Sequence, residues 1–298
     1  MISVIIPAHN EERVIARTLE AMVAGASPGE LEIIVVANGC SDATADVARG
    51  FGEPVKVVET PVASKVNAVN LGDAAARGFP RIYADGDVVI SLTSLRNLAA
   101  ALSDGRWLAA APRVDTVFLP GAAWSVRAYY RFWMALPFVQ EGMMAAGVYA
   151  VSEQGRGRWD QMPDVIADDG YFRLLFGPEE RTEVQTAVSA VRAPSAFADL
   201  IRIKTRSRLG VAQLHARFPE LFAREKRTKR YGRALISILR QPALYPCAFP
   251  FILVSLISRV RAARQAKRAD GYLWERDNSS RVGPEIERDR AALGKRLA

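Results

Sequence analysis

Short β-branched runs alternate with longer amphipathic stretches through the first 84 residues, and this alternation restricts the fold more than any other feature of the sequence. The strand-like runs are residues 3–6, 31–36, 55–59 and 81–84, and the helix-like stretches are residues 11–24, 42–51 and 64–77. Strands that alternate with helices form right-handed βαβ units around a parallel sheet. We therefore expect an α/β fold with a Rossmann-like sheet flanked by helices.

The alternation changes from Trp107 onward, which predicts a mixed second half of the sheet. The patterns there predict strands over 107–118, near Val148 and over 183–191, helices over 122–138 and 168–176, and a loop over 154–159. After Pro194 the sequence predicts only basic helices, over 196–218 and 220–239. We expect one domain over 1–195, with two parts over 1–120 and 121–195, and a basic helical C-terminal region over 196–298.

The charged residues are distributed unevenly along the 298 residues. Residues 1–199 contain 17 Lys and Arg against 24 Asp and Glu, and residues 200–298 contain 23 against 8, so the net charges are −7 and +15. A basic third on an acidic body indicates an anionic partner: nucleic acid, an anionic membrane surface or a phosphorylated ligand. Only two cysteines, Cys40 and Cys247, are present, which excludes a disulfide framework. Since the N-terminal residues also lack a signal-peptide pattern, we expect a cytoplasmic protein.

Residues 241–258 form an uncharged stretch of 18 residues that contains three prolines. A membrane-spanning helix needs about 20 apolar residues, and the prolines argue against a straight one. Twelve Lys and Arg lie between Arg202 and Arg240, and five more lie between Arg259 and Arg268. We expect an interfacial or re-entrant segment that holds the protein peripherally on the inner face of the cell membrane. The alternative is a core helix over 249–257 with solvated charges around it.

Polar clusters follow the expected strands at residues 7–11, 37–42, 64–72 and 85–88. Ligands of open α/β sheets bind at the carboxyl ends of the strands, so these clusters are expected at one edge. Asp85 and Asp87, two residues apart after a strand, can both face one hard cation that also binds phosphates. The alternative is that Asp85-Gly86-Asp87 is only a turn, since Asp and Gly favour turns. The neighbouring polar clusters favour the metal-diphosphate site.

These segments resemble glycosyltransferase family 2, whose members are inverting enzymes with the GT-A fold, over roughly residues 1–210. The matching segments are IIPAHNEE (5–12), VVANGCSDAT (35–44), KVNAVNLG (65–72), DGD (85–87) and IADDGYFRLLF (166–176). Each motif is weak alone, but five in the right order make a specific match.

The resemblance implies that 1–195 is a catalytic domain, with a nucleotide-sugar part (1–120) and an acceptor part (121–195), and it implies a nucleotide-sugar pocket. The implied residues are Pro7, Ala8, Asn10, Glu11, Asn38, Lys65 and Asp85. Many relatives have two aspartates where this chain has Ala37 and Asn38, so a carboxylate expected near the base is missing, although the Asn38 amide can still pair with a base edge. We expect a UDP-sugar donor, with GDP- or dTDP-sugars as alternatives. The resemblance also places Glu141, Gly142, Met143, Met144 and Gly147 beside the acceptor, a glycan or a lipid-linked saccharide.

The resemblance further implies that Asp85 and Asp87 hold the ribose and a Mn²⁺ or Mg²⁺ ion on the diphosphate, and that Asp169 is the catalytic base. The family's Glu-Asp pair is Asp168-Asp169 here, so either carboxylate could be the base, and the alignment favours Asp169. Sugar transfer needs a cation to neutralise the leaving diphosphate and a carboxylate to take the acceptor hydroxyl proton. In-line attack then inverts the anomeric carbon.

We therefore predict a metal-dependent inverting transfer of one sugar from a nucleotide sugar to a hydroxyl acceptor, in the synthesis of cell-surface glycans or glycolipids. The Gln-x-x-Arg-Trp motif of processive synthases is not reproduced, since Ser207 follows Arg206, which favours transfer of a single sugar. One alternative is a sugar-phosphate nucleotidyltransferase, but the loop after the first strand is acidic and has no glycine. The other is a non-catalytic nucleotide- or nucleic-acid-binding protein, for which the basic third shows no zinc, helix-turn-helix or aromatic-interleaved motif.

Overall fold

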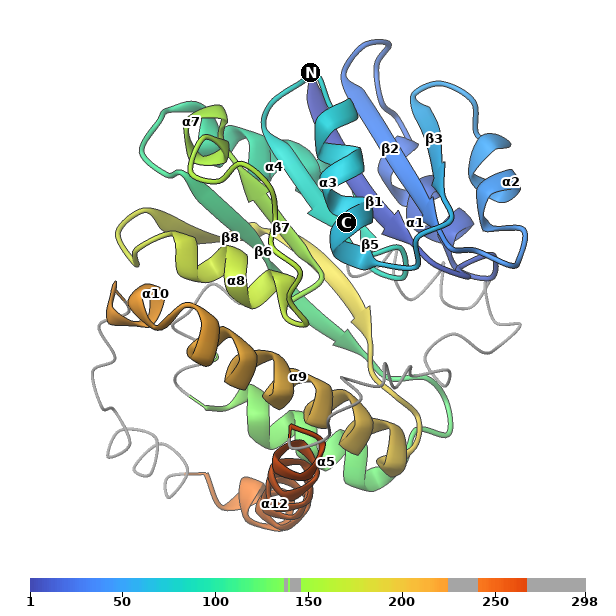
Figure 1. Ribbon diagram of the computed structural model, residues 1–298. Coiled ribbons are helices and arrows are strands. Elements are labelled where there is room, and N and C mark those ends of the chain that lie inside the picture. The colour runs from blue at the N-terminus through green and yellow to red at the C-terminus, as the bar shows by residue number, and fades with distance from the viewer. Residues whose placement is uncertain (137–138, 140–145, 225–240, 267–298) are drawn as a thin grey trace.

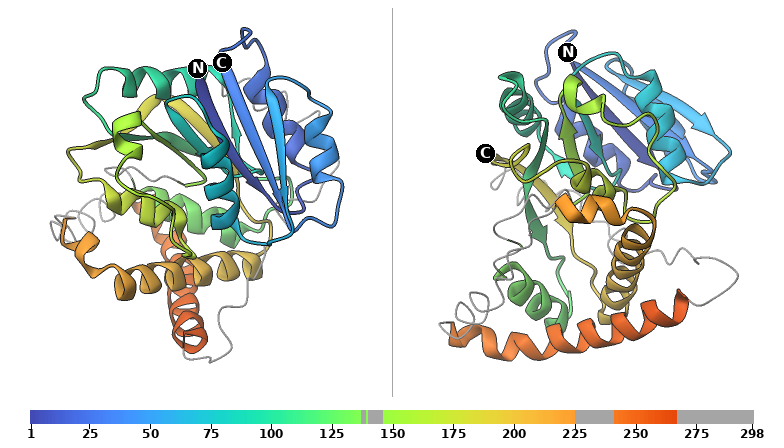
Figure 2. Two further views of the ribbon diagram at one scale, coloured as in Figure 1. Left: turned by 45° about the horizontal axis from the view of Figure 1, so that its top comes forward. Right: turned by 60° about the vertical axis from the view of Figure 1, so that its left-hand side comes forward.

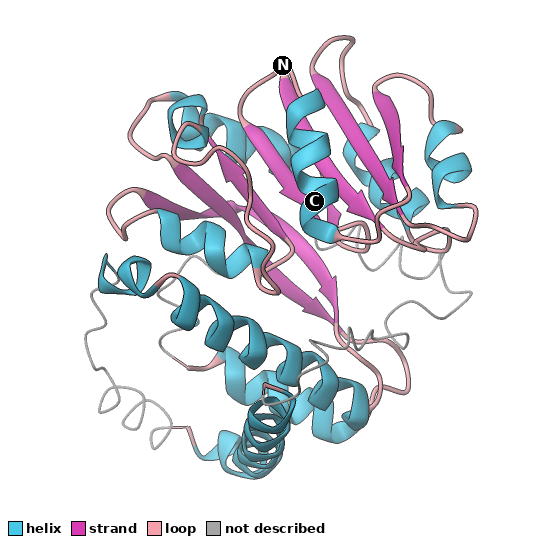
Figure 3. Ribbon diagram, viewed as in Figure 1, coloured by secondary structure: helices cyan, strands magenta, loops and turns pink. Residues whose placement is uncertain are grey.

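The structure is a computed structural model that describes residues 1–136, 139, 146–224 and 241–266. An eight-stranded sheet lies between helices on both of its faces (Figures 1 and 3), with the strand order β3-β2-β1-β4-β7-β6-β8-β5. The strands are β1 (Ile2–Ala8), β2 (Leu31–Asn38), β3 (Val55–Thr60), β4 (Arg81–Ala84), β5 (Val89–Ile90), β6 (Ala109–Val117), β7 (Val148–Val151) and β8 (Arg181–Arg192).

The pairing of the strands confirms the expected mixed sheet, which contains both parallel and antiparallel pairs. Strand β1 is parallel to β2 and β4, and β2 is parallel to β3, as the βαβ alternation predicts. Strand β7 is antiparallel to β4 and β6, β5 is antiparallel to β8, and β6 is parallel to β8. The parallel half therefore carries the motifs that are expected to bind a nucleotide, and the mixed half follows it.

Two cores fill the space between the sheet and its helices. Alternate residues of a strand face opposite sides, so Val4 and Ile6 pack on one side of β1 and Ile5 on the other. Helices α1 (Ile15–Val23), α2 (Thr44–Arg49) and α4 (Leu92–Ser103) cover the first face. Helices α3 (Lys65–Ala75) and α8 (Asp168–Leu175) cover the second. Because both faces are covered, β2 is buried along its whole length.

Three helices form a separate layer beside the sheet (Figure 2): α5 (Trp124–Met134), α9 (Phe197–Arg217) and α12 (Tyr245–Gln265). A core that includes Val126, Leu200 and Val254 joins them. Helix α9 also packs on the part of the protein that contains the sheet. Its Leu214 shares a core with α8, and a Cβ on its Gly210 would lie 2.7 Å from the Ala167 Cβ. The expected boundary near residue 195 falls between β8 and α9, and the division into domains stays a prediction.

Several elements differ from the sequence-based expectation. Strand β5 and helix α4 were not predicted, and a helical turn, α7 (Glu153–Arg156), replaces the loop expected over 154–159. The Ser152 side chain caps this turn by accepting a hydrogen bond from the Gly155 N–H at 3.1 Å. Helix α10 (Pro219–Arg224) begins the helix expected over 220–239, whose remainder lies outside the described residues.

The three prolines of the C-terminal apolar stretch are compatible with a long helix. Pro242 lies in a 3₁₀ turn, η1 (Pro242–Leu244), and Pro246 lies in the first turn of α12, where a backbone N–H has no intrahelical acceptor. Only Pro250 lies inside the helix, where it removes one backbone hydrogen bond. Helix α12 is one continuous helix of 21 residues, and the interfacial or re-entrant placement of this segment stays a prediction.

Candidate active site

The candidate site lies at the carboxyl ends of β1, β2 and β4, which are neighbours in the sheet. This edge is turned toward the layer of α5, α9 and α12 (Figure 1). After β1, Asn10 adopts a left-handed backbone (φ 52°), which asparagine tolerates better than most residues. Its Oδ1 accepts the Ser41 N–H at 2.7 Å, and the Glu11 N–H donates to the Thr44 Oγ1 at 2.7 Å. The loops after β1 and β2 therefore support each other.

Asn38 connects the ends of these two strands. Its side chain is buried, and its Nδ2 donates to the Ala8 carbonyl at 2.8 Å. The Asn38 carbonyl lies 2.6 Å from the His9 Nδ1, which gives His9 a hydrogen-bonding role. Because the Asn38 Nδ2 already donates within the protein, the side-chain Oδ1 is the atom left for a nucleotide base. The nucleotide role of Asn38 stays a prediction.

The Asp85-Gly86-Asp87 turn is held at the end of β4 by close backbone contacts. The Asp85 N–H donates to the Gly147 carbonyl at 2.8 Å, and the Asp85 carbonyl accepts the Val88 N–H at 3.1 Å. Gly147 has a φ of 75°, and a Cβ there would lie 2.8 Å from the Val88 Cγ2, so only glycine fits. This packing fixes the Asp85 side chain at the strand end.

Lys65 links the turn to the second carboxylate pair. Its Nζ lies 2.7 Å from the Asp85 Oδ1 and 2.9 Å from the Asp168 Oδ1, although these residues are far apart in the chain. Lys65 is the first residue of α3, and the Ser64 side chain caps that helix by accepting the Asn67 N–H. Burial alone would lower the pKa of Lys65, but Asp168 and Asp85 raise it above its usual value. The ammonium group is therefore fully charged.

Asp168 and Asp85 are held in different ways around this cation. The Asp168 side chain is 5% exposed, with Oδ1 on Lys65, and its Oδ2 accepts the Tyr149 hydroxyl at 3.3 Å. Burial raises the pKa of Asp85, an effect that Lys65 opposes and that the charges of Asp168 and Asp87 reinforce. Excess negative charge is thus concentrated around Asp85.

Asp169 has no cationic partner within ion-pairing distance among the residues that the structure describes. Its Oδ1 accepts the N–H of the next residue, Gly170, at 2.7 Å. Burial and the adjacent Asp168 charge raise the pKa of Asp169 to about 6. A carboxylate that is half-buried and titrates near neutrality can take a proton from a substrate hydroxyl.

The acidic turn suits a hard divalent cation. Within the described ranges, no group of three or more His, Cys, Asp or Glu side chains is arranged to hold a metal. Two carboxylates, Asp85 and Asp87, are nevertheless close enough to influence each other's charge. Mg²⁺-like ions are commonly bound by one or two carboxylates together with phosphates and water. The residues therefore fit a cation that arrives with, or is completed by, a diphosphate.

Residues 3–146 match the family described as Glycosyl transferase family 2. This part of the chain is therefore similar to the family 2 glycosyltransferases. The matched residues contain Asn10, Asn38, Lys65, Asp85 and Asp87, which were predicted from the motifs of this family. The match supports the expectation of an enzyme of this class, and the specific role of each site residue stays a prediction.

Two curated relatives share part of this glycosyltransferase. The Probable glycosyltransferase YdaM of Bacillus subtilis (strain 168) is 40% identical over 89 residues, which cover 30% of this chain and 21% of that protein. The Dolichyl-phosphate beta-glucosyltransferase of Drosophila melanogaster is 34% identical over 114 residues, which cover 34% of this chain and 35% of that protein. The matches thus span between a fifth and just over a third of these relatives.

Solved structures share the fold of the glycosyltransferase. The mannosyltransferase PcManGT from Pyrobaculum calidifontis, in complex with GDP-Man and Mn²⁺, has a TM-score of 0.57 and 19% identity, and the match covers 100% of this chain and 80% of that chain. Glucosyl-3-phosphoglycerate synthase from Mycobacterium tuberculosis, in complex with Mn²⁺, UDP and phosphoglyceric acid, has a TM-score of 0.51 and 23% identity, with 73% and 78% covered. The expected GT-A fold is confirmed.

An aromatic stack supports the site and was not predicted. The rings of Tyr83 and Tyr149 stack with centroids 4.9 Å apart, and Tyr149 stacks on Phe172 at 4.2 Å. Since Phe172 lies one turn after Asp168 on α8, the stack fixes that helix against β4 and β7. Nothing in the sequence indicates this, because the three residues come from separate segments. Of the residues expected beside the acceptor, Gly147 supports Asp85 as described above, and Glu141, Gly142, Met143 and Met144 lie outside the described residues.

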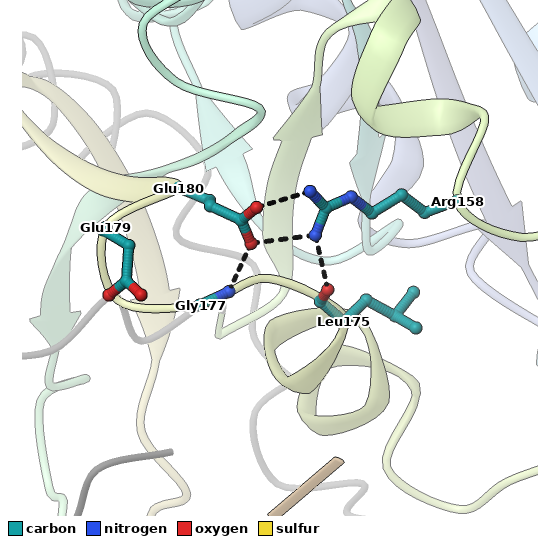
Figure 4. A pocket seen from close by; sticks show the side chains of 5 residues that line it. All are labelled: Arg158, Leu175, Gly177, Glu179 and Glu180. Atoms are coloured by element: carbon teal, nitrogen blue, oxygen red, sulfur yellow. Dashed lines mark hydrogen bonds and ion pairs between the residues drawn. The ribbon is translucent and has the colours of Figure 1, made fainter. Parts of the chain in front are cut away.

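A surface cavity of about 660 Å³ lies at the far end of α8 and contains none of the predicted site residues. It is lined by Arg158, Leu175, Gly177, Glu179 and Glu180 (Figure 4). The Arg158 guanidinium donates to both Glu180 carboxylate oxygens, and its Nη1 also donates to the Leu175 carbonyl (Figure 4). Because these charges neutralise each other, the cavity does not resemble a nucleotide-sugar site.

Proposed function

We propose that this glycosyltransferase moves a single sugar from a nucleotide-sugar donor to a hydroxyl acceptor with inversion, and that Asp169 is the general base. The supporting observation is the contrast between the two adjacent carboxylates. Asp168 is engaged by Lys65 and Tyr149, whereas Asp169 lacks a cationic partner in the described part of the chain and has a pKa of about 6. A base that titrates near the working pH transfers protons most effectively.

The proposal assigns the acidic turn to the donor. Asp85 and Asp87 would hold a Mn²⁺ or Mg²⁺ ion, which when bound neutralises the charge that grows on the leaving diphosphate. Lys65 keeps the Asp85 carboxylate oriented and adds a positive charge beside it. Two structures of similar fold contain Mn²⁺, one with GDP-Man and one with UDP, which supports a divalent cation and a nucleotide-sugar donor. A UDP-sugar is our first choice of donor.

The proposal also includes the setting of the reaction. We propose a glycan or lipid-linked acceptor, and a role in the synthesis of cell-surface glycans or glycolipids. Similarity to a dolichyl-phosphate beta-glucosyltransferase supports the lipid-linked class. The charge of +15 on residues 200–298 supports peripheral attachment to the cytoplasmic face of an anionic membrane.

Substitution of each aspartate tests the assignment of the base. Asp169→Asn should keep donor binding but lower the transfer rate by at least ~10²-fold, the lower limit of what a positioned base contributes. Asp168→Asn, the matched control one residue away, should cost less, because the amide oxygen can still accept from Lys65 while the amide nitrogen donates to the Tyr149 hydroxyl oxygen. Single-turnover transfer and donor titration measure the two effects separately. If Asp168→Asn has the larger effect, Asp168 is the base.

A further inference from the structure

Helix α12 exposes a continuous apolar stripe. Tyr245, Phe249, Ile252, Leu256 and Val260 are 49%, 70%, 53%, 56% and 49% exposed, which makes them half of the large exposed apolar residues in the described chain. They are spaced by three or four residues, so they lie along one face of the helix. We refer to these five residues as the α12 stripe. An apolar surface of this kind usually marks an interaction site.

The opposite face of α12 is fixed to the protein. Cys247, Val254, Ser258 and Ala262 are buried against the neighbouring helices. The Phe251 ring packs on Phe132 of α5 with centroids 4.7 Å apart. Figure 2 shows α12 lying along the outer edge of the helical layer. The helix is therefore anchored on one side and open on the other.

Basic residues flank the α12 stripe. Arg259 and Arg264 are exposed, and at 100° per residue they fall on either side of the stripe. Arg208 of α9 lies at the opposite, buried face of α12, where its Nε donates to the Ser258 Oγ at 2.8 Å. Burial and the nearby Arg259 lower the pKa of Arg208, so these two cations repel each other. From residue 241 to residue 266 the sequence contains no Asp or Glu that could balance them.

We propose that the α12 stripe docks in the plane of an anionic phospholipid bilayer, with Arg259 and Arg264 facing the lipid phosphates. An apolar face between basic flanks is typical of helices that lie in the headgroup region, and anionic lipid phosphates would neutralise the arginines. A symmetric pair of chains is a poorer occupant, because residues 241–266 of a second copy offer no Asp or Glu to neutralise these arginines.

The structure favours docking in the plane over crossing the membrane. By length and composition, residues 242–265 could cross a bilayer. Of the 18-residue apolar stretch within this range, 28% is buried inside the protein. To cross, α12 would have to leave α5 and α9 and expose their shared core around Val254 and Leu200. Docking in the plane buries the stripe and keeps those contacts. The proposal does not depend on the reaction assigned above.

Vesicle co-sedimentation of the full chain tests this proposal. The protein should pellet with phosphatidylcholine vesicles that contain phosphatidylglycerol, pellet poorly with phosphatidylcholine alone, and be released by high salt. The triple variant Phe249→Ser/Ile252→Ser/Leu256→Ser should lower partitioning by at least about 100-fold, because three exposed apolar side chains lose their burial. Arg259→Gln/Arg264→Gln should lower it by at least roughly tenfold, and only in anionic vesicles.

Matched substitutions of exposed residues on the catalytic body serve as controls. Val62→Ser, at a side chain 51% exposed, and Arg113→Gln, at an exposed arginine of β6, should leave partitioning unchanged. Every variant should keep the wild-type melting temperature, because the altered side chains are exposed. Equal pelleting of the wild type and the triple variant would overturn the proposal. So would resistance to alkaline carbonate extraction, which indicates a spanning helix, or a lipid-free dimer that the triple variant dissociates.

Discussion

At the scale of single residues, Asp168 and Asp169 are adjacent in the chain but have opposite surroundings. Asp168 is paired with Lys65 and Tyr149, and its negative charge disfavours ionisation of Asp169. Groups whose environments drive their pKa values apart are suited to different tasks in one reaction. In the proposed reaction, Asp168 would therefore be a positioning residue and Asp169 would accept the proton.

The pH dependence of transfer should reflect this pair. Because Asp169 must be ionised to act as a base, kcat/KM should fall about tenfold per pH unit below a pKa of about 6. Asp168→Asn removes the negative charge that raises the Asp169 pKa, so the acidic limb should move to lower pH. Rate profiles of the wild type and this variant measure the shift. An acidic limb that does not move would show that another group controls it.

The same pKa predicts a cost to stability. The folded-state pKa of Asp169 is about 6, above its ordinary value of 3.8, so folding disfavours the charged form. This contribution to stability is present below pH 3.8 and is lost as the pH rises through 6. Asp169→Asn should therefore raise the free energy of unfolding at neutral pH, on the order of 1 to 2 kcal/mol after solvent screening. Thermal unfolding at acidic and neutral pH tests it, and an equal gain at both would contradict this origin.

The sequence motifs predicted which residues belong to the candidate site, but they did not predict the contacts between these residues. Asp85 and Asp87 stand out because they follow a strand pattern, and Lys65 and Asp169 stand out because they lie in segments that resemble the family's motifs. That Lys65 lies between Asp85 and Asp168 could not be predicted, since the contact joins segments 103 residues apart. The internal use of the Asn38 amide is hidden for the same reason, because its acceptor belongs to another strand.

At the scale of elements, a buried ionic cluster joins α3, β4 and α7. Asp73 of α3 pairs with Arg81 of β4 at 2.7 Å and with Arg156 of α7 at 2.5 Å. It also accepts the Tyr83 hydroxyl at 2.6 Å. Burial would raise the pKa of Asp73, but the hydrogen bonds from Arg156, Tyr83 and Arg81 lower it. The cluster holds the helix that begins at Lys65 against the strand that ends at Ala84.

Removing the Asp73 charge should destabilise the protein strongly. Asp73→Asn leaves two largely buried arginines without a counterion, which costs about 3 to 5 kcal/mol in comparable pairs. The control Asp46→Asn breaks an exposed pair with Arg49 and should cost at most about 1 kcal/mol. Urea unfolding of both variants gives the comparison. Similar losses in the two variants would show that the cluster adds little.

Patterns predicted the parallel half of the sheet well because its two middle strands, β1 and β2, are nearly continuous buried runs. The failures are elements whose existence depends on distant partners. Strand β5 has two residues and forms by pairing with β8, about 100 residues later. Turn α7 depends on the Ser152 cap, and its Arg156 is drawn to Asp73. Such short elements leave no periodic pattern in the sequence.

At the scale of the whole molecule, the site lies where the acidic catalytic body meets the basic helical layer (Figure 1). In the described chain, α9 spans both parts, because its Leu214 packs with α8 and its Leu200 packs with α12. Docking through the α12 stripe would hold this layer against the bilayer. An acceptor carried by a lipid would then need to move only along the membrane surface to approach the site.

Donor binding should stabilise the whole chain and should depend on the acidic turn. A ligand that binds only the folded state at 100 times its Kd contributes about 2.7 kcal/mol, which corresponds to a rise in melting temperature of roughly 5 °C for a protein of this size. We expect this rise with a UDP-sugar and Mn²⁺ together, and a smaller one when either is omitted. UDP-, GDP- and dTDP-sugars compared in one thermal-shift series identify the nucleotide.

Asp87→Asn should remove the part of this rise that requires Mn²⁺, because it takes away one of the two carboxylates available to the ion. Asp104→Asn neutralises an exposed aspartate at the end of α4 and serves as the matched control, which should respond like the wild type. Asp87 is half-buried at the strand end, so its substitution should leave the ligand-free melting temperature nearly unchanged. A full Mn²⁺-dependent rise in Asp87→Asn would exclude this carboxylate as a metal ligand and place the cation elsewhere.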